Sequence, residues 1–224
     1  MRRKHDTAKR VVELIITPVL LFGMLPLLAL VTILVFFAMG RPILYRGERV
    51  GKGERLFNQL KFRTMLNHYG PDGELLPDAQ RLKRFGRFLR KTSLDELPQL
   101  LNILKGEMSF IGPRPLFASY LPRYSALQRR RHEVRPGITG LAQVRGRNDL
   151  DWDLRFASDV EYVVHASFRL DFFIFIRTVM TVLKARGVTA QVVPSNSRYI
   201  GTEEFLGRAT GESELHDKPI AVAS

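Results

Sequence analysis

The most uneven part of the hydrophobic and polar pattern lies near the N-terminus, where no residue between Glu13 and Arg41 is charged. As a straight helix, residues 14–40 would span roughly 40 Å, whereas a bilayer core needs only about 20 apolar residues. The stretch is also too long for the apolar part of a cleaved signal peptide, and it lacks a small-residue cleavage site. The pattern therefore predicts a membrane helix, with a buried core helix as the alternative.

Basic residues flank this apolar stretch on both sides. They are Arg2, Arg3, Lys4, Lys9 and Arg10 before it, and Arg41, Arg46, Arg49, Lys52, Arg55, Lys61 and Arg63 after it. Basic flanks belong on the cytoplasmic side of a membrane, so a simple span would misplace one of them. We therefore expect a helix that enters the membrane and returns to the same face, broken at Pro18 or Pro26. A spanning helix that tolerates both prolines is the alternative.

The middle of the chain predicts short strands and a basic helix. Residues 43–45 and 56–63 read as strands separated by a glycine-containing turn at 46–55, and residues 69–77 read as a loop. Residues 81–91 (RLKRFGRFLRK) place four apolar side chains on one helical face and basic side chains on the other. This helix suits either an anionic membrane surface or the edge of a protein core.

The C-terminal half predicts more helix than strand. A short apolar helix is expected at 97–104, with Gly106 as its C-cap, and another helix at 151–165. Residues 121–134 predict a solvated basic helix face, and residues 135–148 a loop with a short strand. Residues 170–186 carry too many charges to span a membrane, so a core helix and an interfacial helix are equal candidates. The polar tail at 210–224 is expected to be disordered.

Composition adds a constraint on partners. The 224 residues include 35 basic and 22 acidic side chains, which give a formal net charge of +13. This surplus favours nucleic acid, anionic lipid or a polyanionic small molecule, without choosing among them. The chain has no cysteine, which excludes disulfides and cysteine-ligated zinc.

Adjacent carboxylates, Asp95 and Glu96, are the strongest candidates for catalysis. An ionised aspartate can attack a phosphoryl group and form an acyl phosphate. The repulsion between carboxylate and phosphate would have to be offset by an arginine and a divalent cation, and oxygen ligands with phosphate substrates indicate Mg²⁺ at Asp95. Alternatively, Ser93 and Glu96 form a capping box that starts a helix, although Pro98 would then fall inside it. The pattern alone leaves both interpretations open.

Several basic residues are candidates for binding phosphate. Arg114 lies in Gly112–Pro115 (GPRP), where two prolines restrict the backbone and hold the guanidinium at low entropic cost. Further candidates are Lys61, Arg63, Arg145 and Arg147. The histidines His68, His132 and His165 lack the spacing of metal ligands and are expected to be structural.

Long motifs in a fixed order resemble the small monotopic phosphoglycosyl transferases, the bacterial sugar transferase family. The matching runs are 61–65 (KFRTM), 93–100 (SLDELPQL), 102–115 (NILKGEMSFIGPRP) and 135–148 (RPGITGLAQVRGRN). The resemblance covers nearly all of residues 9–187 and is closest to members that consist of the catalytic core alone. It implies an α+β, mainly helical fold: a re-entrant membrane helix at 1–40, interfacial amphipathic helices and a membrane-associated cytosolic catalytic domain at 41–209.

The resemblance also implies a reaction. A sugar 1-phosphate would pass from a UDP-sugar to undecaprenyl phosphate at the cytoplasmic face of the bacterial inner membrane, releasing UMP. Asp95 would be the nucleophile with Mg²⁺, Glu96 its neighbour, and Arg114 a phosphate binder. Anionic lipids are expected partners, nucleic acid is not, and a homo-oligomer is compatible with the sequence. Family members break the helix at Ser-Pro, whereas this chain has Leu25–Pro26. Rival hypotheses are a membrane-anchored nucleic-acid-binding protein and a membrane scaffold.

Overall fold

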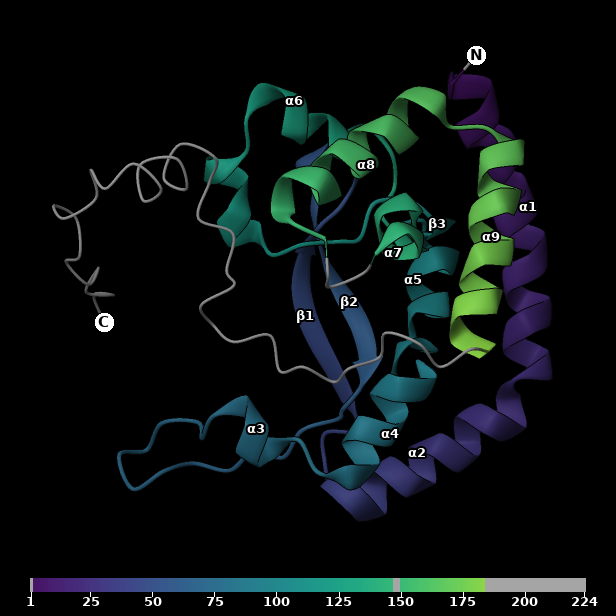
Figure 1. Cartoon of the computed structure of the whole chain (residues 1–224). Coiled ribbons are helices and arrows are strands. Elements are labelled where there is room, and N and C mark those ends of the chain that lie inside the picture. Colours follow the sequence, from purple (N-terminus) through teal and green to yellow (C-terminus); the bar gives the residue numbers. More distant parts are fainter. Residues whose placement is uncertain (1, 147–149, 184–224) are drawn as a thin grey trace, which may run out of the picture.

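The N-terminal apolar stretch folds as two helices, α1 (Arg2–Gly23) and α2 (Leu25–Met39), in a computed structural model that describes residues 2–146 and 150–183. The two helix axes differ by 62° across the break at Met24 (Figure 1). Pro26 occupies the first turn of α2, where a missing N–H costs no helical hydrogen bond, and Pro18 lies inside α1. In the described ranges no single helix is long and apolar enough to cross a membrane, but this bent pair meets that test together.

The start of α1 is fixed to the body of the protein by buried polar contacts. The Lys9 ammonium donates to the Ile111 carbonyl at 2.7 Å and to the Tyr162 hydroxyl at 2.8 Å, and it pairs with Asp171 at 3.0 Å. Arg10 donates to the carbonyl groups of Ile103 and Leu104, at 2.5 and 2.8 Å. Part of the basic N-terminal flank therefore serves internal packing.

A hairpin of two antiparallel strands forms the centre of the molecule. β1 (Leu44–Val50) pairs along its whole length with β2 (Leu56–Phe62), and a 3₁₀ turn, η1 (Lys52–Glu54), joins them. The predicted turn at 46–55 is therefore too long, because residues 46–50 continue the strand that β2 pairs with. A second, parallel pair joins β3 (Ser109–Ile111) to β4 (Gly137–Thr139). The sheets are small, and the fold is α+β and mainly helical.

Short helices follow the hairpin. They are α3 (Asp78–Arg81), α4 (Arg84–Thr92), the 3₁₀ turn η2 (Leu94–Glu96) and α5 (Gln99–Lys105). The predicted basic helix thus begins three residues late, and Leu82 is buried in the connection between α3 and α4. Along α4, Leu89 is buried with residues of α2 and β2, whereas Phe88 is 51% exposed. The predicted C-cap is confirmed, since Gly106 adopts a φ of 83°.

The α4 helix touches the end of β2 so closely that Gly86 has no room for a side chain. A Cβ at Gly86 would lie 1.9 Å from the Thr64 carbonyl oxygen, whereas one at Gly23 would meet no atom within 4 Å. We expect Gly86→Ala to destabilise the fold by about 1–3 kcal/mol through overpacking, and Gly23→Ala to cause no loss. Thermal unfolding in detergent measures both, and an equal effect at the two sites would contradict this packing.

The C-terminal half consists mainly of short helices. They are η3 (Ala118–Arg123), α6 (Ala126–Arg129), η4 (Arg130–Glu133), α7 (Leu141–Arg145), α8 (Trp152–His165) and α9 (Phe168–Leu183). The helix predicted at 151–165 is confirmed, whereas α7 was missed inside a segment read as loop and strand. The predicted solvated face at 129–132 is wrong in part, because Arg131 and His132 are buried. Along α9, Ile174 is fully buried in the core and Phe172 is 66% exposed. The interfacial alternative stays a prediction. The predicted tail at 210–224 lies outside the described residues.

Candidate active site

An open cleft of about 1320 Å³ lies beside the β1–β2 hairpin and reaches from the end of α4 to α7 and α8. Its basic lining residues, which include Lys61, Arg90 and Arg114, outnumber its acidic ones, which include Asp95 and Glu96. The cleft thus gathers most of the residues that the sequence singled out for phosphoryl chemistry. A concave site with a surplus of cations concentrates anionic ligands.

The carboxylate pair reaches this cleft through a sharp turn after α4. Ser93 ends α4 with a left-handed φ of 58°, and its side chain caps no helix. Asp95 and Glu96 follow in η2, and α5 begins only at Gln99, with Pro98 as its N-cap. The capping-box alternative is therefore wrong, and the two acids precede the apolar helix.

Glu96 is held between two cations. Lys61, from β2, donates to Glu96 Oε1 at 2.6 Å, and Arg114 donates to the same oxygen at 3.0 Å. Burial by itself would raise the pKa of Glu96, but Arg114 and Lys61 outweigh it and lower that pKa to about 2. Glu96 is therefore ionised at neutral pH, and it positions both cations at the wall of the cleft.

Asp95 has a different electrostatic environment. Its side chain is buried, and burial together with the neighbouring charge of Glu96 raises its pKa to about 6, against the opposing effects of Lys61, Arg90 and Arg114. At pH 7 the carboxylate is still mostly ionised, and it is more basic than an ordinary aspartate. This combination of charge and basicity suits a nucleophile.

Arg90 is a residue of this site that the sequence did not single out. It projects from α4 into the cleft, contributes a favourable charge to Asp95, and donates to the Thr64 hydroxyl at 3.0 Å. In the sequence it was one of six basic residues on an amphipathic helix. The helical spacing alone could not show which of them turns toward the carboxylates.

Arg114 is held from behind by a buried ion pair. Arg131 donates to the Arg114 carbonyl at 2.7 Å and to Asp159 at 2.7 and 3.1 Å, and the side chains of Arg131 and Asp159 are each 2% exposed. The charge of Glu96 raises the pKa of Arg114, whose side chain is 45% exposed toward the cleft. Arg114 thus combines a fixed backbone with an accessible guanidinium.

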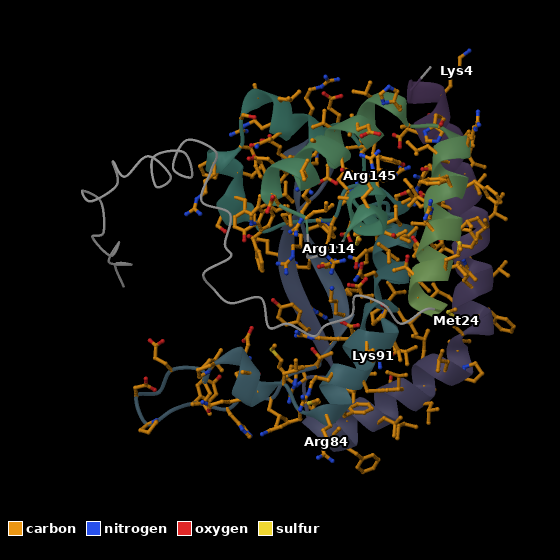
Figure 2. All side chains as sticks on the ribbon, in the orientation of Figure 1. Lys4, Met24, Arg84, Lys91, Arg114 and Arg145 are labelled. Carbon is orange, nitrogen blue, oxygen red and sulfur yellow. The ribbon has the colours of Figure 1, made fainter. Side chains whose placement is uncertain are left out.

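The other phosphate-binding candidates lie elsewhere. Arg63 lines the cleft, but it donates to the carbonyls of Met39, Arg41 and Pro42 at the end of α2. Arg145 is outside the cleft lining and binds Glu161 at 2.5 and 2.6 Å; Figure 2 shows it apart from Arg114.

The guanidinium groups of Arg63 and Arg145 are thus already engaged by protein groups. Arg145 therefore does not line the cleft that holds the carboxylate pair. Phosphate binding by Arg63 and by Arg145 stays a prediction, and Arg147 lies outside the described residues.

The side chains near Asp95 determine how the expected Mg²⁺ could be bound. Over residues 2–146 and 150–183, no group of three or more His, Cys, Asp or Glu side chains is arranged to hold a metal ion. Mg²⁺ at phosphate sites is commonly bound by only one or two carboxylates together with the substrate's phosphates. Asp95 fits that kind of shared site, whereas Lys61 and Arg114 already neutralise Glu96.

Comparison with known proteins covers nearly all of the described chain. The family model described as "Bacterial sugar transferase" matches residues 4–185. "Uncharacterized sugar transferase EpsL" of Bacillus subtilis is 46% identical over 169 residues, which cover 75% of this chain and 81% of that protein. "Exopolysaccharide production protein ExoY" of Rhizobium meliloti is 38% identical over 197 residues, covering 80% and 87%. "UDP-glucose:undecaprenyl-phosphate glucose-1-phosphate transferase" of Caulobacter vibrioides is 39% identical over 194 residues, covering 80% and 70%.

Proposed function

This chain belongs to the bacterial sugar transferase family and is a sugar-phosphate transferase; from this premise we propose that it transfers a sugar 1-phosphate from a UDP-sugar to undecaprenyl phosphate. The products are UMP and an undecaprenyl-diphosphate sugar. The lipid-linked sugar is the first membrane-bound product of glycan assembly. The observation that carries this proposal is a buried, ionised Asp95 in a basic cleft beside the fixed guanidinium of Arg114. The substrates named for the Caulobacter relative have the same chemistry.

The mechanism has two displacements at one phosphorus atom. In the first, an oxygen of Asp95 attacks the phosphate attached to the sugar, and the bond to the UMP phosphate breaks, so that UMP leaves with the electron pair. In the second, an oxygen of the lipid phosphate attacks the acyl phosphate, and the bond to Asp95 breaks and restores the carboxylate. Arg114 and Lys61 stabilise the charge on the transferring phosphoryl group. Mg²⁺ bound at Asp95 would supply further neutralisation of phosphate charge.

The exposed apolar helices support a lipid acceptor. We propose that α1 and α2 enter the bilayer and return to the cytoplasmic face, with their bend beside Pro26. Large apolar side chains are exposed on both helices, for example Phe22 at 78% and Phe37 at 79%. The exposed apolar face of α9, which lies beside α1 in Figure 1, would rest in the interface. This chain has Leu25–Pro26 beside the bend, where the family resemblance implied a Ser-Pro pair.

The rival hypotheses do not account for the cleft. A nucleic-acid-binding protein needs basic residues, and a scaffold needs apolar and basic surfaces. Neither needs Asp95 to be buried beside a second carboxylate that two cations hold in place. We therefore keep the transferase as the proposed function.

Release of UMP tests the reaction directly. With Mg²⁺, undecaprenyl phosphate and a panel of UDP-sugars, we expect at least one sugar nucleotide to yield UMP in multiple turnovers. Without the lipid, release should stop at about one UMP per enzyme molecule, because the phosphosugar stays on Asp95. Folded enzyme in detergent that releases no UMP from any donor would contradict the proposed function, and continued release without lipid would contradict the two-step mechanism.

A further inference from the structure

The wall of the cleft beyond Arg114 carries two arginines that the mechanism above does not use. Arg49 lies on β1 and Arg155 on α8, and both line the cleft with Arg114. Burial, followed by the repulsion of Arg114, lowers the pKa of Arg49. Burial also lowers the pKa of Arg155; the nearby Asp159 opposes this shift, and Arg114 and Arg131 add to it. Positive charge therefore accumulates at this wall, which an anionic ligand would stabilise.

Both arginines lie over rings in a row of aromatic side chains. The guanidinium carbon of Arg49 lies 3.7 Å from the centre of the Phe117 ring, and that of Arg155 lies 4.3 Å from the centre of the Trp152 ring. Tyr120 joins the two rings through edge-to-face contacts at 6.0 and 5.8 Å. Arg49 also donates to the Glu48 carbonyl at 2.8 Å, and Arg155 donates to the Leu150 carbonyl at 3.3 Å, so each guanidinium is held in place by a backbone contact as well as by a ring. Positioned guanidinium groups that line a cleft together with Arg114 suit an anion such as phosphate.

The position of this wall relative to the membrane helices separates it from the lipid. Leu44, at the start of β1, packs with the buried residues of α2, and Tyr45 lies opposite Lys61. Arg49 comes four residues after Tyr45, about 13 Å further along the strand. Figure 1 shows β1 running away from α2 toward α6 and α8. Because α2 belongs to the proposed membrane-embedded pair, the lipid phosphate approaches from the Lys61 end, which lies nearer to α2 than the Arg49 end does.

We propose that Arg49, Arg155 and the exposed ring of Phe117 form the subsite that holds the nucleoside monophosphate half of the donor. This inference rests on the proposed function, and it names which end of the cleft each substrate takes. The nucleoside phosphate is adjacent to the phosphate that Asp95 attacks, and Arg114 lies beside both positions. Negative charge grows on the nucleoside phosphate as its bond breaks, so fixed guanidinium groups there stabilise the leaving group. Phe117, 47% exposed in the cleft, offers a ring edge to the base or ribose.

Arg49→Gln tests the subsite by separating the donor from the acceptor. We expect the KM for the UDP-sugar to rise about tenfold or more, which corresponds to the loss of one charge-assisted hydrogen bond. The KM for undecaprenyl phosphate should stay within about twofold. Direct binding of UDP, measured in an Asp95→Asn background that cannot turn over, should weaken by a similar factor. Arg49→Lys should recover only part of the loss, because an ammonium group neither forks nor stacks like a guanidinium.

A matched control is Arg130→Gln, which removes an exposed arginine paired with Glu133 outside the cleft; UDP binding should not change. If Arg49→Gln does not fold, UDP binding and the donor KM can be measured on Arg155→Gln and Phe117→Leu instead. Unchanged UDP binding and donor KM in these cleft variants would overturn the inference, as would a rise confined to the acceptor KM. A wild-type enzyme that releases no UMP would instead reject the proposed reaction, while the binding measurement still reports on the subsite.

Discussion

Asp95→Asn is expected to reduce turnover by about a thousandfold or more while the fold is retained. The amide has nearly the same shape, but it lacks the charged oxygen that attacks phosphorus, and loss of a nucleophile removes the whole two-step route. Because burial raises the pKa of Asp95 to about 6, the ionised side chain is less stable in the folded protein than in the unfolded chain. Replacing it with a neutral amide should therefore leave the melting temperature unchanged or raise it.

The covalent step gives this prediction its sharpest measurement. Wild-type enzyme incubated with a labelled UDP-sugar and no lipid should carry the sugar phosphate on the peptide that contains Asp95, as mass spectrometry would show. Asp95→Asn should carry none. Asp153→Asn is a suitable control, because Asp153 is an exposed carboxylate on α8 outside the cleft lining. If Asp95→Asn kept a tenth of wild-type turnover, or if the label lay elsewhere, Asp95 would not be the nucleophile.

Local signals in the sequence were enough for several elements. The helix predicted at 151–165 matches α8 to within one residue of its start. Gly106 marked the end of α5, where its left-handed φ of 83° suits glycine. The apolar stretch at 14–40, which has basic residues on both sides, predicted a break beside Pro18 or Pro26. The bend lies two residues before Pro26. These features depend on neighbours in sequence, so a single chain reveals them.

The capping box at Ser93 shows where local reasoning stops. Its pattern, a serine followed three residues later by a glutamate, fits a helix start as well as a catalytic turn. What decides between them is the contact of Glu96 with Lys61, 35 residues earlier, and with Arg114, 18 residues later. Neither partner is marked by local spacing, and the family resemblance implied a catalytic role for Asp95 without these contacts of Glu96.

The basic residues show the same limit more strongly. Arg145 stood in a motif with Arg147 and was expected to bind phosphate, but in the folded chain it pairs with Glu161. Arg49 and Arg155 were ordinary basic positions until the fold placed them in one cleft. Net charge predicts that a polyanion binds, whereas the choice of arginines depends on which helices and strands meet.

Arg131→Met is expected to destabilise the protein by about 3–5 kcal/mol, because it leaves Asp159 buried without its partner. Burial alone already raises the pKa of Asp159, and Arg131 opposes that shift. The neighbouring Arg130→Met removes only an exposed ion pair with Glu133 and should cost about 1 kcal/mol or less. Thermal unfolding of the three proteins in one detergent measures the difference. Similar melting temperatures for Arg131→Met and Arg130→Met would show that the buried pair does not stabilise the fold.

The double variant Arg131→Met/Asp159→Leu separates stability from positioning. Replacing both buried charges with apolar groups is often neutral or stabilising, so most of the lost stability should return. Turnover should not return with it, because the Arg114 carbonyl still lacks the hydrogen bond that Arg131 donates at 2.7 Å. A misplaced Arg114 acts on the phosphoryl group that is being transferred, so we expect a lower kcat as well as a higher donor KM. A double variant that recovers both stability and kcat would show that Arg131 serves folding alone and that Pro113 and Pro115 suffice to hold Arg114.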